Sequence, residues 1–128
     1  MTRPRLQVAA LDCPDPLVLA AFYSELTGLA VEPLGDFPEE NVTWIELVAE
    51  HGPTLGFQKV ANHVAPTWPE GPIPQQAHLD FAVDDLDDGE AFVLGIGARK
   101  ADVQPDPADF RVFLDPAGHP FCLVRAST

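Results

Sequence analysis

Two side chains that could work together in proton transfer lie two residues apart in the segment 76–83, which is predicted to form a strand. Successive side chains on a strand point to opposite faces, so His78 and Asp80 are predicted to share one face. A histidine beside a carboxylate can act as a general acid or base. The same pairing also fits a structural histidine whose hydrogen bonds are satisfied by Asp80 or Gln58.

Cys122 is a second reactive side chain and lies in the closing segment FLDPAGHPFCLV (113–124). This segment is predicted to form two strands joined by a turn, since Pro116 fixes φ and Gly118 can adopt a left-handed backbone. A divalent metal needs three or four converging ligands, and one histidine with one cysteine is a poor site. If a metal is present, its ligands are expected to be His78 and Cys122. We favour the alternative, in which Cys122 is a small apolar residue of a binding-site wall.

Further candidate residues follow from the alternation of side chains in the other strands. The apolar positions of each strand are assigned to the core, and the residues between them are then predicted to share the face of His78. These residues are Trp44, Glu46, Gln58, Arg111 and Phe113. Aromatic side chains with a few polar groups are typical of a small-molecule site. Glu46 and Arg111 could equally pair with each other or reach solvent, and Trp44 could serve only in packing.

Other reactive motifs are absent from the sequence. It contains no nucleophile motif, no glycine-rich phosphate loop and no CxxC pair. The remaining histidines fall in predicted turns or in a linker and are expected on the surface: His51, His63 and His119.

The elements that must position these residues are predicted in the same order twice. The first series is a strand at 7–11, a helix at 16–28 and strands at 30–33, 42–48 and 54–60. The second is a strand at 76–83, a helix from 84 to 97 and strands at 100–103, 110–114 and 121–125. Asp15 is predicted to cap the first helix. The acidic run at 84–88 is predicted to cap the second rather than to bind calcium, because the ligand spacing of a calcium loop is missing.

The chain is therefore predicted to contain two βαβββ modules, 6–60 and 76–126, within a single domain, 1–128. Each module has roughly 60 residues, too few to bury a good core alone, so the two are expected to share one. The intervening segment 61–75 is rich in proline and is predicted to be an extended linker. Trp68 within it could pin the linker to the body or cover a pocket.

The composition excludes some partners. A net charge of −13 over 128 residues argues against nucleic acids and anionic membranes, which need a basic surface. No apolar run approaches the roughly 20 residues of a membrane span, and no signal peptide is recognisable, so a cytoplasmic location is predicted. In that compartment Cys13 and Cys122 are expected to be reduced and unbridged.

The duplicated βαβββ order, the strand HLDFAVDD (78–85) that leads into an acidic helix start, and the closing DPAGHPFCLV (115–124) resemble the vicinal oxygen chelate superfamily. This superfamily contains glyoxalase I, extradiol dioxygenases and bleomycin-resistance proteins, and the chain is most similar to small glyoxalase-like proteins of bacteria. The resemblance covers nearly the whole chain. It implies an α+β fold in which curled mixed sheets form a cup with the helices on the outer face. It also implies a homodimer.

The resemblance further implies where a metal would bind. Metal enzymes of the superfamily place one ligand on the first and last strand of each module. The matching positions here are His78, Cys122, Val8 and Gly56, with Gln58 as a polar alternative near Gly56. Val8 and Gly56 offer no donor atom, so no catalytic metal or other cofactor is predicted.

The favoured hypothesis is a metal-free protein that binds a small organic molecule, neutral or cationic and bearing an aromatic group. The alternative is an enzyme of the same superfamily: a lyase, isomerase or dioxygenase that uses a metal, or His78 with Asp80 as an acid–base pair. A third interpretation is a module whose main role is protein association.

Overall fold

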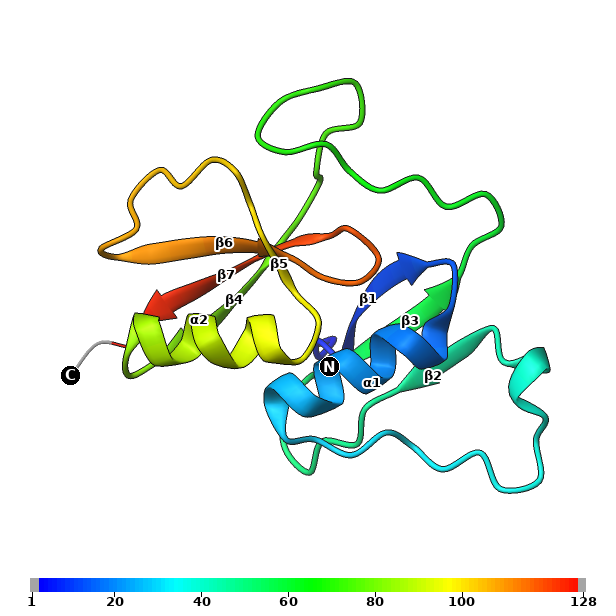
Figure 1. The fold of residues 1–128 in the computed structure, drawn as a ribbon. Helices are drawn as coiled ribbons and strands as arrows, with labels where there is room; N and C mark the ends of the chain where they lie inside the picture. The colour runs from blue at the N-terminus through cyan, green and yellow to red at the C-terminus, as the bar shows by residue number, and fades with distance from the viewer. Residues whose placement is uncertain (1–2, 127–128) are drawn as a thin grey trace. The chain divides into compact units, whose positions relative to one another are not determined.

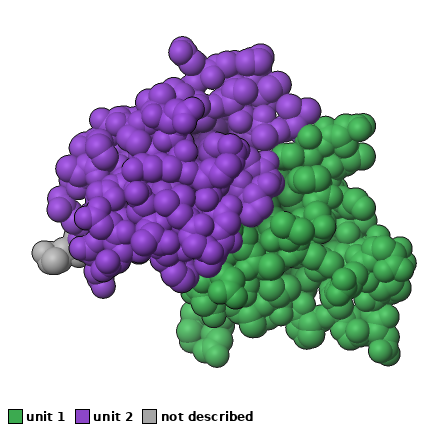
Figure 2. Space-filling model, in the orientation of Figure 1, with its two compact units in different colours: residues 1–63 green, residues 64–128 purple. Residues whose placement is uncertain are grey.

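The structure, a computed structural model, describes residues 3–126. The chain divides into two compact units, Met1–His63 and Val64–Thr128 (Figure 2). Each unit combines one α-helix with one mixed sheet, so the fold is α+β as predicted (Figure 1). In the described part of the chain, neither helix is long and apolar enough to cross a membrane.

The first unit contains a three-stranded sheet. Its elements are β1 (Val8–Cys13), α1 (Pro16–Thr27), the short 3₁₀ helix η1 (Glu39–Asn41), β2 (Trp44–Glu46) and β3 (Thr54–Lys59). The strand order is β1-β3-β2, with β3 parallel to β1 and antiparallel to β2. The predicted strand at 30–33 is reduced to a single bridge between Val31 and Leu47.

Helix α1 begins and ends where the sequence predicts. The side chain of Asp15 accepts a hydrogen bond from the Leu17 N–H, and Gly28 ends the helix with φ of 78°. The buried face of the helix packs on β3, where Tyr23 stacks on Phe57 with ring centroids 5.6 Å apart. This packing fixes which face of the sheet is the core.

The second unit repeats the order of strand, helix and strands. Its elements are β4 (Leu79–Val83), α2 (Leu86–Gly95), β5 (Arg99–Lys100), β6 (Phe110–Leu114) and β7 (Pro120–Arg125). The strand order is β4-β7-β6-β5, with β4 parallel to β7 and the other pairs antiparallel. Strand β4 begins at Leu79, three residues later than predicted.

Local hydrogen bonds explain the start of α2 and the β6–β7 turn. The carboxylate of Asp85 accepts from the Asp88 N–H at 2.9 Å, so the acidic run caps the helix as predicted. In the turn, the buried Asp115 accepts from the N–H groups of Ala117 and His119, and Gly118 has φ of 90°. This turn sets the register that places Cys122 opposite Val112.

The segment 64–75 differs from the predicted extended linker, because it folds back on itself and belongs to the second unit. Figure 1 draws it as the green loop before β4. Thr67 and Ile73 close the loop through hydrogen bonds of the Thr67 backbone and hydroxyl. The half-buried Trp68 packs against the cluster of Ala101, Val112 and Cys122.

Candidate functional site

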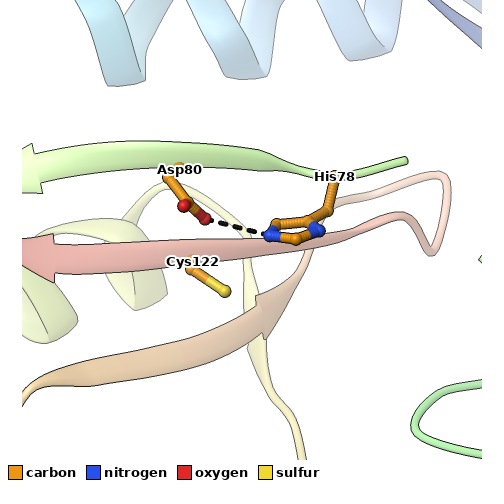
Figure 3. Close-up of side chains that lie close together, drawn as sticks. All are labelled: His78, Asp80 and Cys122. Carbon is orange, nitrogen blue, oxygen red and sulfur yellow. Dashed lines mark ion pairs between the residues drawn. The ribbon is translucent and has the colours of Figure 1, made fainter.

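His78, Asp80 and Cys122 form a cluster in the second unit (Figure 3). His78 directly precedes β4, Asp80 lies within β4, and Cys122 is the register partner of Asp80 on the parallel strand β7. The Nε2 atom of His78 lies 3.2 Å from Oδ1 of Asp80. The nitrogen, oxygen and sulfur that the three residues offer all lie within 4.8 Å of one another.

The cluster lies on the face of the second sheet that carries Asp80, Cys122 and Val112, which we call the Asp80 face. Helix α2 covers the opposite face, where Gly89 approaches the side chain of Leu123. On the Asp80 face, the side chains of His78 and Asp80 are 44% and 56% exposed, whereas Cys122 is only 9% exposed. A polar pair open to solvent therefore stands beside a buried thiol.

The environment of Cys122 keeps its thiol protonated. Burial, first, and then the negative charge of Asp80 and a hydrogen bond to its carboxylate together raise the pKa of Cys122 to about 11. Thiolates, not thiols, are nucleophiles and metal ligands. At neutral pH Cys122 is therefore a hydrogen-bond donor to Asp80.

The donor set fits a divalent metal in part. Three ligand atoms of mixed type in close reach are the number that catalytic zinc sites use. From the sequence, His78 and Cys122 were expected to be the ligands if a metal binds, and Asp80 was not included as a third ligand. The signal was available, because Asp80 shares a face with His78 at i+2. A metal would, however, have to displace the proton of Cys122.

The first unit offers no comparable donors at the equivalent positions. Aligning the helix caps Asp15 and Asp85 makes Val8 and Ala10 the counterparts of His78 and Asp80. Gly56, the register partner of Ala10, is then the counterpart of Cys122. None of these three side chains can coordinate a metal, so the four-strand ligand set implied by the family resemblance is incomplete.

Trp44, Glu46 and Gln58 share one face of the first sheet. Trp44 pairs with Gln58 and Glu46 with Gly56, and the buried Ile45 faces the core. The indole Nε1 of Trp44 donates to a carboxylate oxygen of Glu46 at 2.9 Å. A Cβ at Gly56 would lie 2.5 Å from Cζ2 of Trp44, so the indole lies directly over Gly56.

Arg111 and Phe113 do not share the face of His78, and that prediction is wrong. Their register partners on β7 are Leu123 and Phe121, which face α2. Phe113 is fully buried and stacks on Phe121 with ring centroids 5.8 Å apart. The residues at 110, 112 and 114 were assigned to the core because they are apolar. Both faces of β6 are covered, so apolar residues occur on either face.

The guanidinium of Arg111 is tied to the helix instead. It contacts Asp87 at 2.8 Å and Glu90 at 3.3 Å, and its Nε donates to the carbonyl oxygen of Pro107. These acidic partners, Asp87 first, raise the pKa of Arg111. They also explain why a charge is tolerated on the core side of the sheet.

The described geometry agrees with a comparison against protein families. A model of the glyoxalase-like domain matches residues 8–124, which covers both units and all of the candidate residues. The chain belongs to the glyoxalase-like family. No curated protein matches this glyoxalase-like chain.

Solved structures give the same fold at low sequence identity. The fosfomycin resistance protein FosX from Mesorhizobium loti is 13% identical, with a TM-score of 0.69 over 98% of this chain and 94% of its own. A glyoxalase/bleomycin resistance protein/dioxygenase family enzyme from Burkholderia phytofirmans is 15% identical, with a TM-score of 0.67 over 97% of this chain and 100% of its own. A glyoxalase-related enzyme from Fulvimarina pelagi is 22% identical, with a TM-score of 0.62 over 95% of this chain and 88% of its own. At these identities the likeness shows the fold of the glyoxalase-like chain alone.

Proposed function

We propose that this glyoxalase-like protein binds a small organic molecule on the Asp80 face of its second unit and needs no resident metal to do so. The observation that carries the proposal is the solvent-exposed His78–Asp80 pair beside the protonated, buried Cys122. Such a combination of two accessible polar groups and an apolar neighbour can orient a ligand.

The charge of the site favours neutral or cationic ligands over anions. Asp80 lies directly beside His78 and is 56% exposed. Arg111, which the sequence assigned to the face of His78, instead contacts Asp87 and Glu90 of α2. A ligand N–H group can therefore donate to the Asp80 carboxylate, and charge-assisted hydrogen bonds of this kind are among the stronger ones.

Two features support binding without a metal. The first unit contributes no donor at Val8 or Gly56, and the indole of Trp44 lies over Gly56. In the second unit the thiol proton of Cys122 is stabilised by burial and by Asp80. Both features count against a site built around a metal ion.

The second candidate is an enzyme, and the three-donor cluster is the observation that favours it. His78 could exchange a proton with a substrate while Asp80 orients the imidazole. A divalent metal held by His78, Asp80 and Cys122 would instead supply a Lewis acid. We also expect the protein to be a homodimer and to be located in the cytoplasm. These two expectations remain predictions.

A thermal-shift screen tests the proposal. The panel consists of aromatic amidines, amides and carboxylates on phenyl, indole and naphthyl rings, together with Zn²⁺, Ni²⁺, Mn²⁺ and Fe²⁺. A ligand at a hundredfold excess over its Kd stabilises the folded state by about 2.7 kcal/mol, which is measurable. We expect amidines and amides to raise the Tm more than the matched carboxylates do.

Two variants make the screen specific. Asp80→Asn should abolish the shift given by the amidines, whereas Asp88→Asn removes the same charge from the exposed surface of α2 and should leave it intact. A screen in which only metal ions stabilise the wild-type protein, with the effect lost in His78→Ala, would establish the second candidate instead.

A further inference from the structure

Trp68 lies next to the candidate site although it comes from a segment predicted to be a linker. Its half-buried side chain packs against the cluster of Ala101, Val112 and Cys122. The sulfur of Cys122 is in turn within 4.8 Å of the donor atoms of His78 and Asp80. The indole therefore packs against the same buried cluster that contains Cys122, the residue beside the polar pair.

The loop that carries Trp68 is held in place at two points. Thr67 and Ile73 are joined by three hydrogen bonds, which close the loop around residues 68–72. Ala65 lies against Gly118 of the β6–β7 turn so closely that a Cβ at Gly118 would be 2.5 Å from the Cβ of Ala65. A side chain on a loop fixed in this way can form a binding wall without first being ordered by the ligand.

Gln75, at the end of the same loop, has a buried side-chain oxygen that lacks a hydrogen-bond donor. In the part of the chain that the structure describes, Oε1 of Gln75 is the buried side-chain oxygen without a hydrogen bond. Buried amide oxygens are nearly always satisfied by protein, water or ligand donors. Gln75 lies three residues before His78. The segment that carries Trp68 therefore ends in an acceptor that lacks a protein partner.

We infer that Trp68 determines the specificity of the site by forming its apolar wall. This inference rests on the proposed function and names its ligand class: a flat aromatic or conjugated ring that contacts Trp68, joined to a hydrogen-bond donor that reaches Asp80. Stacking on the indole selects for the ring, and the carboxylate selects for the donor. Small polar molecules without a ring satisfy only the second requirement.

A pair of probes separates the two requirements. 2-Naphthamidine carries both the ring and the donor, whereas acetamidine carries only the donor. Their affinities are measured by calorimetric titration of the full chain, of Trp68→Ala and of Trp68→Phe. Val64→Ala is the control, because Val64 lies in the same segment and is 64% exposed.

The wild-type protein should bind 2-naphthamidine more tightly than acetamidine. Trp68→Ala should weaken 2-naphthamidine about fivefold to tenfold, as expected for loss of an aromatic contact, and leave acetamidine unchanged. Trp68→Phe should retain most of the affinity, and Val64→Ala all of it.

Equal binding of 2-naphthamidine by Trp68→Ala and the wild type would overturn the inference while leaving the proposed function standing. Tighter binding by Trp68→Ala would also overturn it, by showing that the indole fills the ligand's place. If the wild type binds neither probe, the proposed function itself fails.

A spectroscopic readout does not depend on variants that weaken the loop. The protein has two tryptophans, so a ¹⁵N–¹H spectrum shows two indole signals, and Trp44→Phe assigns them. 2-Naphthamidine should shift the signal of Trp68 through the ring current of the naphthyl group. A spectrum in which the Trp44 signal moves and the Trp68 signal does not would contradict the inference.

Discussion

Asp80 has two roles among the side chains of the site. Its carboxylate lies 3.2 Å from Nε2 of His78, and it also accepts a hydrogen bond from the thiol of Cys122. The first contact orients the imidazole, and the second keeps the thiol protonated. A substitution of Asp80 should therefore alter both the orientation of the His78 imidazole and the protonation of the Cys122 thiol.

The reactivity of Cys122 tests the contact with Asp80. Asp80→Asn removes a negative charge and should lower the pKa of Cys122 from about 11 towards its ordinary value of 9.0. Because burial is the larger cause, part of the elevation should remain. The measurement is the pH dependence of iodoacetamide labelling at Cys122, followed by mass spectrometry. Asp88→Asn should leave the profile unchanged, and an identical profile in Asp80→Asn would refute the contact.

Stability at alkaline pH depends on the same thiol. The pKa of Cys122 is higher in the folded protein, about 11, than the ordinary value of 9.0, so the folded state binds the proton more tightly. The resulting stabilisation is fully present below pH 9 and is lost as the pH rises through 11. Urea unfolding should show a smaller decline of the free energy of unfolding over this interval in Cys122→Ala than in the wild type. If the free energy of unfolding declines with pH equally in Cys122→Ala and in the wild type, the thiol does not contribute to stability in this way.

At the scale of elements, β6 shows where reasoning from alternation fails. Its apolar residues Phe110 and Val112 were assigned to the helix side, but they lie on the Asp80 face, where Trp68 packs against the same cluster. A strand that is covered on both faces does not reveal its orientation through hydrophobicity. In β4, by contrast, one face is open to solvent, and Asp80 lies on that face beside His78.

The anchoring of Arg111 gives a prediction for this element. Arg111→Met keeps most of the side-chain length but removes the contacts with Asp87 and Glu90, and its side chain is only 16% exposed. We expect a measurable loss in the free energy of unfolding in urea, larger than the loss in the control variant. Arg125→Met is the control, because the Arg125–Asp109 pair is 58% and 67% exposed and should contribute less than about 1 kcal/mol. Equal losses of stability in Arg111→Met and Arg125→Met would show that the contacts of Arg111 with Asp87 and Glu90 do not stabilise the fold. Binding of 2-naphthamidine should be the same in Arg111→Met as in the wild type.

In the first unit, Gly56 and Trp44 form a pair whose contact can be tested directly. In Gly56→Ala the new Cβ would lie 2.5 Å from Cζ2 of Trp44, so the indole must move and lose its bond to Glu46. Overpacking of this kind costs about 1–3 kcal/mol, and the tryptophan emission should change. Gly95→Ala is the matched control, because nothing lies within 4 Å of that position and α2 should gain helix propensity. A neutral Gly56→Ala would mean that the indole does not lie over the strand.

For the whole molecule, the sequence was sufficient to predict a strand, a helix and further strands in each unit, but the strand expected at 30–33 is only a bridge at Val31. Caps at Asp15 and Asp85 and the turn at Gly118 are local signals, and each is present in the structure. The loop at 64–75 could not be predicted, because its prolines favour extended backbone while its position depends on packing distant in sequence, of Trp68 against the cluster of Ala101, Val112 and Cys122. The third member of the donor cluster was also missed, since the ligand set was taken from a family pattern that spans four strands.

Binding without a metal is tested most sharply by a calorimetric titration of 2-naphthamidine into protein dialysed against EDTA, with the metal content determined before and after dialysis. We predict binding by the dialysed wild-type protein, no stoichiometric metal at either stage, and loss of binding in Asp80→Asn. Heat of binding that disappears on dialysis and returns with added Zn²⁺ would contradict this prediction and would make His78, Asp80 and Cys122 a metal site.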